Sequence, residues 1–412
     1  MSNEILFLAH RIPFPADRGD KIRSHHILRR LARMAPVHVA CFADDDKDMA
    51  EEVELAALAH TYRLTRRAKS LAVAGMQALA QGRPVSLTAF HDACIAAYVK
   101  QTLATGRIGT IYVFSGQMAQ YVPDDFGGRV VLDLVDVDSA KFDAYGLAGS
   151  GPMGWVHARE GRLLRSYEAR CALRADVTLL ISDKEAQLFR SRLSALELAG
   201  TDVQVVGNGI DADHYDPALV SPEHRLQAMA RPRLIFTGQM DYPPNIAAVD
   251  RVARRLMPAI REACPDASFH IVGRAPTEAV RVLSAIEGVH VWGRVDDVRC
   301  WLKAADIALA PLEIARGVQN KVLEAMAMEL PVVLTNAAAT GIPATAGHHF
   351  AVADSDADLI AQVVRLARDQ RAATVMGLDA RRLVLERQSW QTALAPLAGI
   401  LSSRPRVLSD AA

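Results

Sequence analysis

The stretch DIALAPLEIARGVQNKVLEAMAMELPVVLT, residues 306–335, predicts two buried strands joined by a helix. Its two ends, 306–311 and 331–335, are short apolar runs typical of strands that are covered on both faces. The segment between them, 319–329, carries apolar residues at the spacing i, i+1, i+4, i+5 of a helix that packs on a sheet. These residues are Val322, Leu323, Met326 and Ala327. A strand, a helix and a second strand form a parallel βαβ unit, so the stretch predicts an α/β protein.

The same alternation of short apolar runs and helix-length segments extends outward over the chain. It predicts strands at 5–9, 37–42, 108–114, 130–134, 177–182, 233–238, 268–273, 289–293, 306–311 and 331–335. The segment 216–231, rich in proline and charge, separates two such series and predicts a linker or hinge. We therefore predict two Rossmann-like, doubly wound parallel-sheet domains, 1–215 and 232–386, that face a central cleft.

Composition excludes several classes of protein. The 412 residues suffice for two domains, and 47 basic against 47 acidic residues give no net field that would attract nucleic acid. The five cysteines are scattered and no histidine lies near them at metal spacing, which predicts a reducing, cytoplasmic setting without a metal site. The start of the chain lacks the pattern of a signal peptide, and no apolar run reaches the roughly 18 residues of a membrane span.

Lys321 and Glu324 lie on the side of the 319–329 helix opposite its apolar residues. Their i, i+3 spacing suits an exposed ion pair worth a few tenths of a kcal/mol (about 0.2–0.5). Gly317, just before the helix, favours a different interpretation, because free N–H groups at a helix start suit a diphosphate. These residues alone leave both interpretations open.

Longer strings resemble one enzyme family. VQVVGNGIDADHYDP (203–217) resembles the signature (I/V)-P-N-G-(V/I)-D-x-x-x-F-x-P of the GT-B glycosyltransferases of family GT4, with Gly207 where proline is usual. LIFTGQMDYPPN (234–245) resembles the strand that opens the family's nucleotide-binding domain. PFPADRGDKIRS, DLVDVDSAKF and ARGVQNKVLEAMAM are similar to strings of the exosortase-associated glycosyltransferases of bacterial exopolysaccharide clusters. RQSWQTALAPL (387–397) resembles the last helix of the family, which implies that 387–405 crosses back to the first domain.

The resemblance implies a GT-B fold and a retaining, metal-independent hexosyltransferase. Such an enzyme moves a sugar from a UDP- or GDP-sugar to a glycan or polyprenyl-linked acceptor, without a cofactor, in the cytoplasm and in transient contact with the inner membrane face. Two alternatives stay open. A nucleotide-sugar 2-epimerase shares the architecture, and a non-catalytic sugar-nucleotide-binding protein would tolerate departures from the family pattern.

The departures concern the donor site. In the family a Glu-x7-Glu pair contacts the donor, and its second member, which binds the ribose hydroxyls, corresponds to Glu324, whereas Arg316 occupies the position of the first. Gln239 and Asn245 replace two cations that usually neutralise the diphosphate, and we expect Arg316, Lys321 and Arg274 to supply that charge. The predicted donor site comprises Gly19, Gly238, Gln239, Arg274, Val295, Gly317, Val318, Gln319 and Glu324, with Arg316 and Lys321 as catalytic cations.

In the first half, Asp136 and Asp138 are predicted to orient the acceptor as catalytic residues. Their D-x-D pattern also holds a metal in GT-A transferases, but those enzymes lack a second Rossmann half, and capping of a helix by Asp138 or Ser139 is an equal alternative.

Two basic segments of the first half have open interpretations. Gly19 lets the backbone approach a ligand, or the loop is simply capped by Asp20. Lys21 and Arg23 face the acceptor or membrane lipid headgroups, or they form a solvated basic face. The segment 66–80, basic and then apolar, is interpreted as a core helix rather than a lipid contact.

Overall fold

The computed structural model describes residues 4–16, 18–149, 151–315 and 318–403. It divides into two compact units, one formed by 1–208 together with 394–412 and the other by 209–393. The division falls at Asn208, and the segment 216–231 belongs to the second unit, where it forms η2 (Pro217–Leu219) and α11 (His224–Gln227). A hinge at 216–231 stays a prediction.

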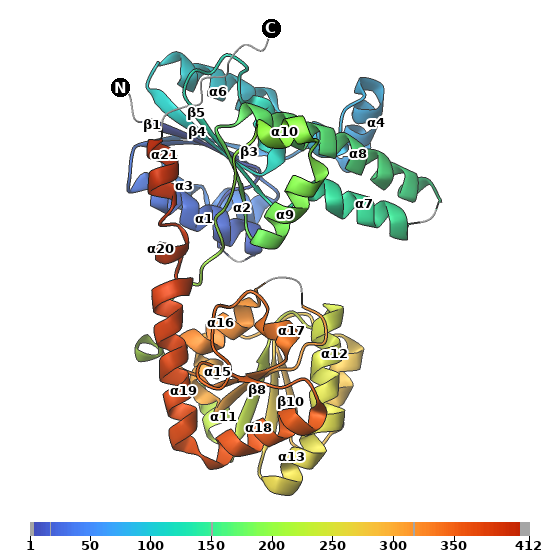
Figure 1. Cartoon of the computed structure of the whole chain (residues 1–412), viewed down its shortest axis with the longest axis vertical. Coiled ribbons are helices and arrows are strands. Elements are labelled where there is room, and N and C mark those ends of the chain that lie inside the picture. Colours follow the sequence, from blue (N-terminus) through green and yellow to red (C-terminus); the bar gives the residue numbers. More distant parts are fainter. Residues whose placement is uncertain (1–3, 17, 150, 316–317, 404–412) are drawn as a thin grey trace. The chain divides into compact units, whose positions relative to one another are not determined.

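The first unit is built on a sheet of seven parallel strands in the order β3-β2-β1-β4-β5-β6-β7 (Figure 1). The strands are β1 (Glu4–Ala9), β2 (Val37–Ala43), β3 (Thr61–Arg66), β4 (Ile108–Phe114), β5 (Arg129–Val135), β6 (Val177–Leu180) and β7 (Val203–Val205). The chain runs outward from β1 in one direction and from β4 in the other. The carboxyl ends of β1 and β4 therefore form the switch point at which ligands of such sheets bind.

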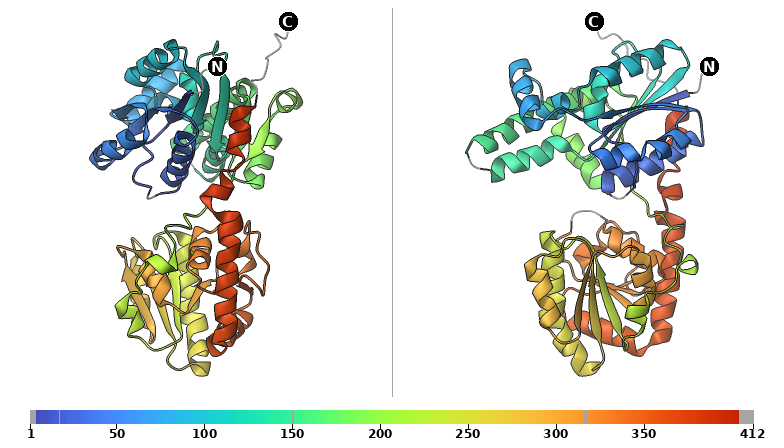
Figure 2. Two further views of the ribbon diagram at one scale, coloured as in Figure 1. Left: turned by 90° about the vertical axis from the view of Figure 1, so that its left-hand side faces the viewer. Right: turned by 180° about the vertical axis from the view of Figure 1, so that it is seen from behind.

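Helices connect these strands and cover the sheet. They are α1 (Gly19–Ala32), α2 (Asp46–Ala50), α3 (Glu52–Leu58), α4 (Leu71–Gln81), α5 (Val85–Ala89), α6 (Ala93–Ala104), η1 (Gly116–Tyr121), α7 (Asp138–Ala148), α8 (Gly151–Arg174), α9 (Asp183–Arg192), α10 (Ala195–Ala199) and α21 (Leu397–Ser402). In Figure 1 and in the right-hand view of Figure 2, α4 and the pair α7 and α8 extend away from the sheet of this unit.

The second unit repeats the design with six parallel strands in the order β10-β9-β8-β11-β12-β13. The strands are β8 (Arg233–Thr237), β9 (Ser268–Val272), β10 (Val289–Gly293), β11 (Ile307–Ala310), β12 (Val332–Leu334) and β13 (Ala351–Val352). Its further helices are α12 (Pro243–Arg251), η3 (Val252–Leu256), α13 (Met257–Ala263), α14 (Glu278–Arg281), η4 (Val282–Ala285), α15 (Val298–Ala304), α16 (Asn320–Ala327), α17 (Asn336–Ala339), α18 (Asp356–Arg368), α19 (Gln370–Leu383), η5 (Val384–Gln388) and α20 (Trp390–Ala393). The predicted pair of doubly wound parallel sheets is confirmed.

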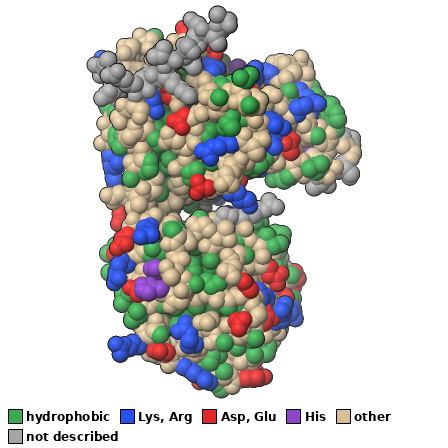
Figure 3. All heavy atoms as spheres, in the orientation of Figure 1, with side chains coloured by type: hydrophobic (Ala, Val, Ile, Leu, Met, Phe, Trp, Pro, Cys, Tyr) green, Lys and Arg blue, Asp and Glu red, His purple; other side chains and the backbone are tan. Residues whose placement is uncertain are grey.

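The surface reflects the balanced composition. Figure 3 shows Lys and Arg side chains intermixed with Asp and Glu side chains on the visible face of each unit. None of the helices in the described ranges combines the length and the apolar character that a membrane span requires.

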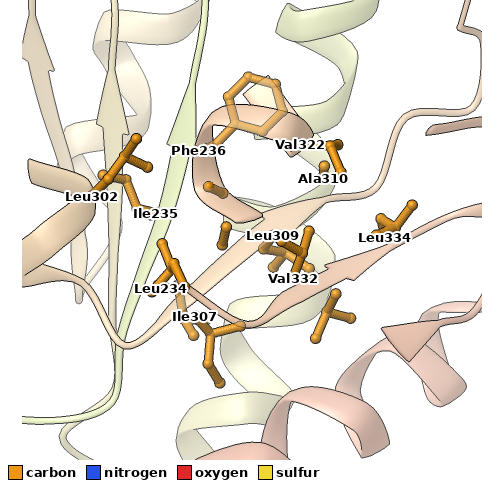
Figure 4. Close-up of a cluster of buried hydrophobic side chains, with 14 of the residues drawn as sticks. Leu234, Ile235, Phe236, Leu302, Ile307, Leu309, Ala310, Val322, Val332 and Leu334 are labelled. Atoms are coloured by element: carbon orange, nitrogen blue, oxygen red, sulfur yellow. The ribbon is translucent and has the colours of Figure 1, made fainter. Parts of the chain in front are cut away.

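The core of the second unit lies around the stretch 306–335 (Figure 4). Val322, at 1% exposure, packs with Phe236 and Leu309 of neighbouring strands, and the other three residues of the predicted helical face are equally buried. The predicted apolar face of α16 is therefore confirmed, and it fixes which side of the helix carries Lys321.

Two interpretations of basic segments are wrong. Lys21 and Arg23 do not form a solvated basic face: their exposures are 2% and 0%, because each pairs with a buried carboxylate, Asp48 and Asp133 respectively. The segment 66–80 does not form a core helix either. Only Ala74 and Ala78 of α4 are buried, since the helix lies on the domain through its small side chains.

Candidate functional site

The carboxyl ends of β8 and β9 lie against each other in the second unit. A Cβ on Gly273 would lie 1.6 Å from the carbonyl oxygen of Gly238, and the Gly238 N–H donates to Val272 at 3.1 Å. Gly238 itself has φ +151°, a backbone conformation that glycine adopts without strain. Strand β8 adjoins the switch point between β8 and β11, and the glycine that follows it presents backbone without a side chain of its own.

Lys321 reaches this place from the first turn of α16. A Cβ on Gly238 would lie 3.1 Å from the Lys321 ammonium, and that ammonium lies 4.1 Å from the centre of the Phe236 ring. Burial lowers the pKa of Lys321 to about 7, although the nearby Glu324 opposes the shift. The ammonium thus lies close to the glycine backbone and loses much of its hydration there.

A chain of polar contacts links the neighbouring candidate residues. Lys321 donates to the side-chain oxygen of Asn245 at 2.5 Å, and the Asn245 amide donates to the backbone oxygen of Gln239 at 2.8 Å. The Gln239 side chain in turn accepts from Arg274 at 3.0 Å. The structure therefore brings Gly238, Gln239, Arg274 and Lys321 together through Asn245.

Glu324 lies one turn further along α16, and its carboxylate accepts a hydrogen bond from the hydroxyl of Tyr215. Burial raises the pKa of Glu324, while the bond from Tyr215 and the charge of Lys321 act in the opposite direction. Among the described residues no salt bridge joins Lys321 to Glu324, so the exposed ion pair considered above is wrong. Tyr215 belongs to the string 203–217, but the sequence does not identify it as a site residue. The string resembles a family signature, and nothing in it indicates a contact of the Tyr215 hydroxyl.

The remaining predicted donor residues are dispersed. Gln319 is the N-cap of α16, and Val318 lies 40% exposed before it, whereas Arg316 and Gly317 fall outside the described residues. Val295 is partly buried in the loop between β10 and α15. Gly19 belongs to the first unit, where it opens α1 with empty space around it.

In the first unit, Asp136 and Asp138 converge on Lys141. The Lys141 ammonium donates to Asp136 at 2.9 Å and to Asp138 at 3.1 Å, and Gln117 donates to the other oxygen of Asp138 at 3.1 Å. Burial works against the charge of Lys141, but the two carboxylates raise its pKa above the ordinary value. Lys141 follows Asp138 by three residues and Asp136 by five. This spacing in the sequence indicates that the three side chains can form ion pairs.

The helix-capping alternatives for this region are wrong. The N-cap of α7 is Val137, without a side-chain cap, because Asp138 binds Lys141 and Gln117 while Ser139 binds Glu168. Asp20 is no cap of α1 either, since its carboxylate pairs with Arg11 at 2.7 Å.

Strained backbone marks the same end of the first sheet. Ser115 directly follows β4 and has φ 75°. Val135 is the last residue of the adjacent strand β5 and has φ 70°. Positive φ is a costly conformation for a β-branched residue, and such strain gathers at functional sites. Asp136 directly follows Val135, so the strained residue sets the direction in which the carboxylate leaves the strand.

A cavity of about 610 Å³ lies at the opposite end of the second sheet. Pro232, Ile307 and Pro331 line it where their strands begin. Of the two carboxylates that line it, Asp306 is paired with Arg231 and Arg233, and Glu329 lies 3.6 Å from Arg381. The glycine and lysine cluster at the strand ends is therefore the better candidate site.

Comparison with known proteins gives a consistent result. Residues 231–369, which lie in the second unit, match the model of the family described as Glycosyl transferases group 1. A phosphatidyl-myo-inositol mannosyltransferase of Propionibacterium freudenreichii subsp. shermanii is 30% identical over 193 residues, which are 45% of this chain and 46% of that protein. The match thus spans about half the length of this relative.

Solved structures extend the likeness to both units. The Anabaena protein HepE in complex with UDP and glucose superimposes with a TM-score of 0.62 at 16% identity, covering 98% of this chain and 100% of that chain. WaaG, a glycosyltransferase involved in lipopolysaccharide biosynthesis, gives a TM-score of 0.59 at 16% identity, with 97% and 100% covered. The fold is therefore the GT-B fold.

Proposed function

We propose that this chain is a retaining, metal-independent glycosyltransferase that uses a nucleoside diphosphate sugar as donor. The single observation that carries the proposal is the Lys321 ammonium, which lies beside the side-chain-free backbone of Gly238 within a domain of the group 1 glycosyltransferase type. The structural neighbour HepE of Anabaena is in complex with UDP and glucose, which supports the same class of donor for this chain.

The chemistry requires the bond between the sugar and the diphosphate to break while the acceptor oxygen bonds to the sugar. Negative charge then grows on the departing diphosphate, and a cation held in place beforehand stabilises it most effectively. Lys321 meets this requirement, because Asn245 and Phe236 fix its position before any ligand is bound. Arg274 and the backbone N–H groups that begin α16 are proposed to act on the same phosphates.

Glu324 is proposed to accept the two ribose hydroxyls of the donor, with Tyr215 orienting its carboxylate. In the first unit Asp136 and Asp138 are proposed to orient the acceptor, held by Lys141 and Gln117. Arg316, at the position of the family's first glutamate, is proposed to select the donor sugar.

The acceptor is proposed to be a glycan or a polyprenyl-linked sugar of exopolysaccharide or cell-envelope synthesis. A lipid-linked acceptor implies that the enzyme works in the cytoplasm and at the inner face of the membrane.

The test incubates the protein with a panel of UDP- and GDP-sugars, with and without bacterial lipid extract, and follows nucleotide release and sugar products. Nucleotide release that requires the acceptor supports the transferase. Isomerisation of the donor without acceptor identifies an epimerase, and binding of a nucleotide without turnover identifies a non-catalytic protein; either result overturns the proposal.

A further inference from the structure

The outward face of α4 is apolar, which is the reverse of an ordinary surface helix. The two residues of α4 that face the domain are Ala74 and Ala78. The larger apolar side chains point away from it: Leu71, Val73, Met76 and Leu79 are 69%, 41%, 65% and 53% exposed. Between Leu71 and Gln81 the sequence contains no charged residue that would hydrate this face.

A second group of apolar side chains lies where α7 ends and α8 begins. These are Tyr145, Leu147, Met153 and Trp155, with exposures of 55%, 90%, 60% and 59%. They face outward for a geometric reason, because the two helices approach closely at glycines. A Cβ on Gly146 would lie 3.0 Å from the Ala158 backbone, so no large side chain fits between the helices.

Polar contacts hold the two groups on one body, the projecting arm, which we define as α4, α7 and α8 up to Ser166. Arg159 of α8 donates to the carbonyl oxygens of Ala78 at 3.1 Å and Arg83 at 3.2 Å, at the carboxyl end of α4. Glu160 accepts from the Val85 and Ser86 N–H groups directly after α4. The exposed apolar side chains therefore belong to an anchored structure that extends from the sheet in Figures 1 and 2.

Asp143 of α7 pairs with Arg192, and beyond it the charged residues next to the second apolar group are basic with one exception. Between Ala144 and Ser166 the only acid is Glu160, which is 2% exposed and bonded as described, whereas the same segment holds Arg159, Arg162 and Arg165. Trp155, Arg159 and Arg162 share one face of α8 at the spacing i, i+4, i+7. Among the described residues no salt bridge joins Arg159 or Arg162 to a carboxylate, whereas Arg165 interacts electrostatically with Glu197. Figure 3 shows green and blue side chains beside each other over this part of the first unit.

We propose that the projecting arm docks on the surface of an anionic phospholipid bilayer. Aromatic and aliphatic side chains would enter the boundary between headgroups and acyl chains, while the exposed Arg162 and Arg165 would contact lipid phosphates. An apolar protein partner would not require cations without carboxylate partners, and this charge complementarity is the reason to prefer a membrane. The inference extends the proposed function, since it names the surface through which the enzyme would reach a lipid-linked acceptor.

Trp155 provides a direct reporter. The chain has four tryptophans, of which Trp155 is 59% exposed, Trp301 and Trp390 are 1% and 6% exposed, and Trp292 is partly buried. Phosphatidylcholine vesicles with a third of phosphatidylglycerol should shift the Trp155 emission to shorter wavelength, and brominated acyl chains should quench it. The assay contains no sugar nucleotide, so its outcome is independent of catalysis.

Matched variants locate the surface by vesicle sedimentation. Met76→Glu should weaken binding about tenfold, the loss expected for withdrawing one large apolar side chain from lipid. Leu219→Glu, at a residue 74% exposed in the second unit, should leave binding unchanged. Arg162→Gln should weaken binding about fivefold on anionic vesicles only.

Absence of wild-type binding to anionic vesicles would overturn the proposal, as would equal binding by Met76→Glu and Leu219→Glu. Light scattering adds a further outcome: a wild-type dimer that Met76→Glu dissociates would mean that a second copy covers the arm, which also overturns it.

Discussion

The Lys321 ammonium and the Asn245 side-chain oxygen lie 2.5 Å apart, so the cation of α16 is held by an asparagine from the start of α12. Because the same ammonium is buried over Phe236, it is positioned but poorly hydrated. The negative charge of a bound diphosphate would compensate for the missing hydration and stabilise the charged form of Lys321.

Nucleotide binding should take up protons above neutral pH. With a pKa of about 7, Lys321 is largely neutral at pH 8.5 in the free protein, and a bound diphosphate should favour its charged form. Calorimetric titration of UDP and GDP in buffers of different ionisation enthalpy should give an uptake of up to about one proton per nucleotide at this pH. Lys321→Met should abolish the uptake, and an unchanged uptake in this variant would exclude Lys321 as its source.

Glu324 should distinguish ribose from deoxyribose. If its carboxylate accepts the ribose hydroxyls, wild type should bind a nucleoside diphosphate more tightly than its 2′-deoxy form, by about tenfold or more for one lost charged hydrogen bond. Glu324→Gln should reduce this preference, and Tyr215→Phe should reduce it partly, because the carboxylate loses its orienting hydroxyl. Equal preferences in wild type and Glu324→Gln, measured by competition binding, would place the ribose elsewhere.

Arg23 and Asp133 should form a strongly coupled pair. Both are 0% exposed, their side chains lie 2.9 Å apart, and Arg23 also donates to Asn208 at 2.9 Å, where the first unit ends. Arg23→Met should lower the free energy of unfolding by about 3–5 kcal/mol, since it leaves the Asp133 charge buried without its cation. Adding Asp133→Asn should recover part of this loss in urea unfolding. Additive losses in the double variant would show that the two side chains act independently.

Glu168 should make the stability of the protein decrease with pH. Burial raises the pKa of Glu168 to about 7, although the hydrogen bonds from Ser139 oppose the shift. Between pH 4.5 and 7 the folded state then binds more protons than the unfolded state, so the stabilisation is complete below about pH 4.5 and is lost as the pH rises through 7.

The size of this effect is at most about 3 kcal/mol. Glu168→Gln, which mimics the protonated acid, should flatten the pH dependence of urea unfolding in that window. An identical pH profile in this variant would contradict the prediction.

The sequence predicted the fold more completely than the site. All five predicted strands of the second unit are present, because buried parallel strands give continuous apolar runs. The edge strand β3 was missed, since Thr61–Arg66 includes two arginines and none of its residues is fully buried. Strand β13 was missed for a different reason, as it spans only two residues.

In the candidate site, Lys321 and Glu324 could be predicted from their positions in the sequence. Their hydrogen-bond partners could not, because these come from distant segments of the chain. Asn245 is 76 residues from Lys321, and no periodic pattern links them. Tyr215 and Gln117 likewise depend on how strands and loops end, which a single sequence does not record. The positive φ of Val135 has no sequence signal, because valine is the residue type least expected there.

The measurement that tests the central claim most directly is calorimetric titration of UDP and GDP into wild type, Lys321→Met and Lys303→Met. Lys303 is an exposed lysine of α15 in the same unit and serves as the matched control. We predict that one of the two nucleotides binds wild type and Lys303→Met equally and binds Lys321→Met at least about tenfold more weakly, as expected for the loss of one charge-assisted contact. Equal binding to all three proteins, or binding of neither nucleotide to wild type, would contradict the account.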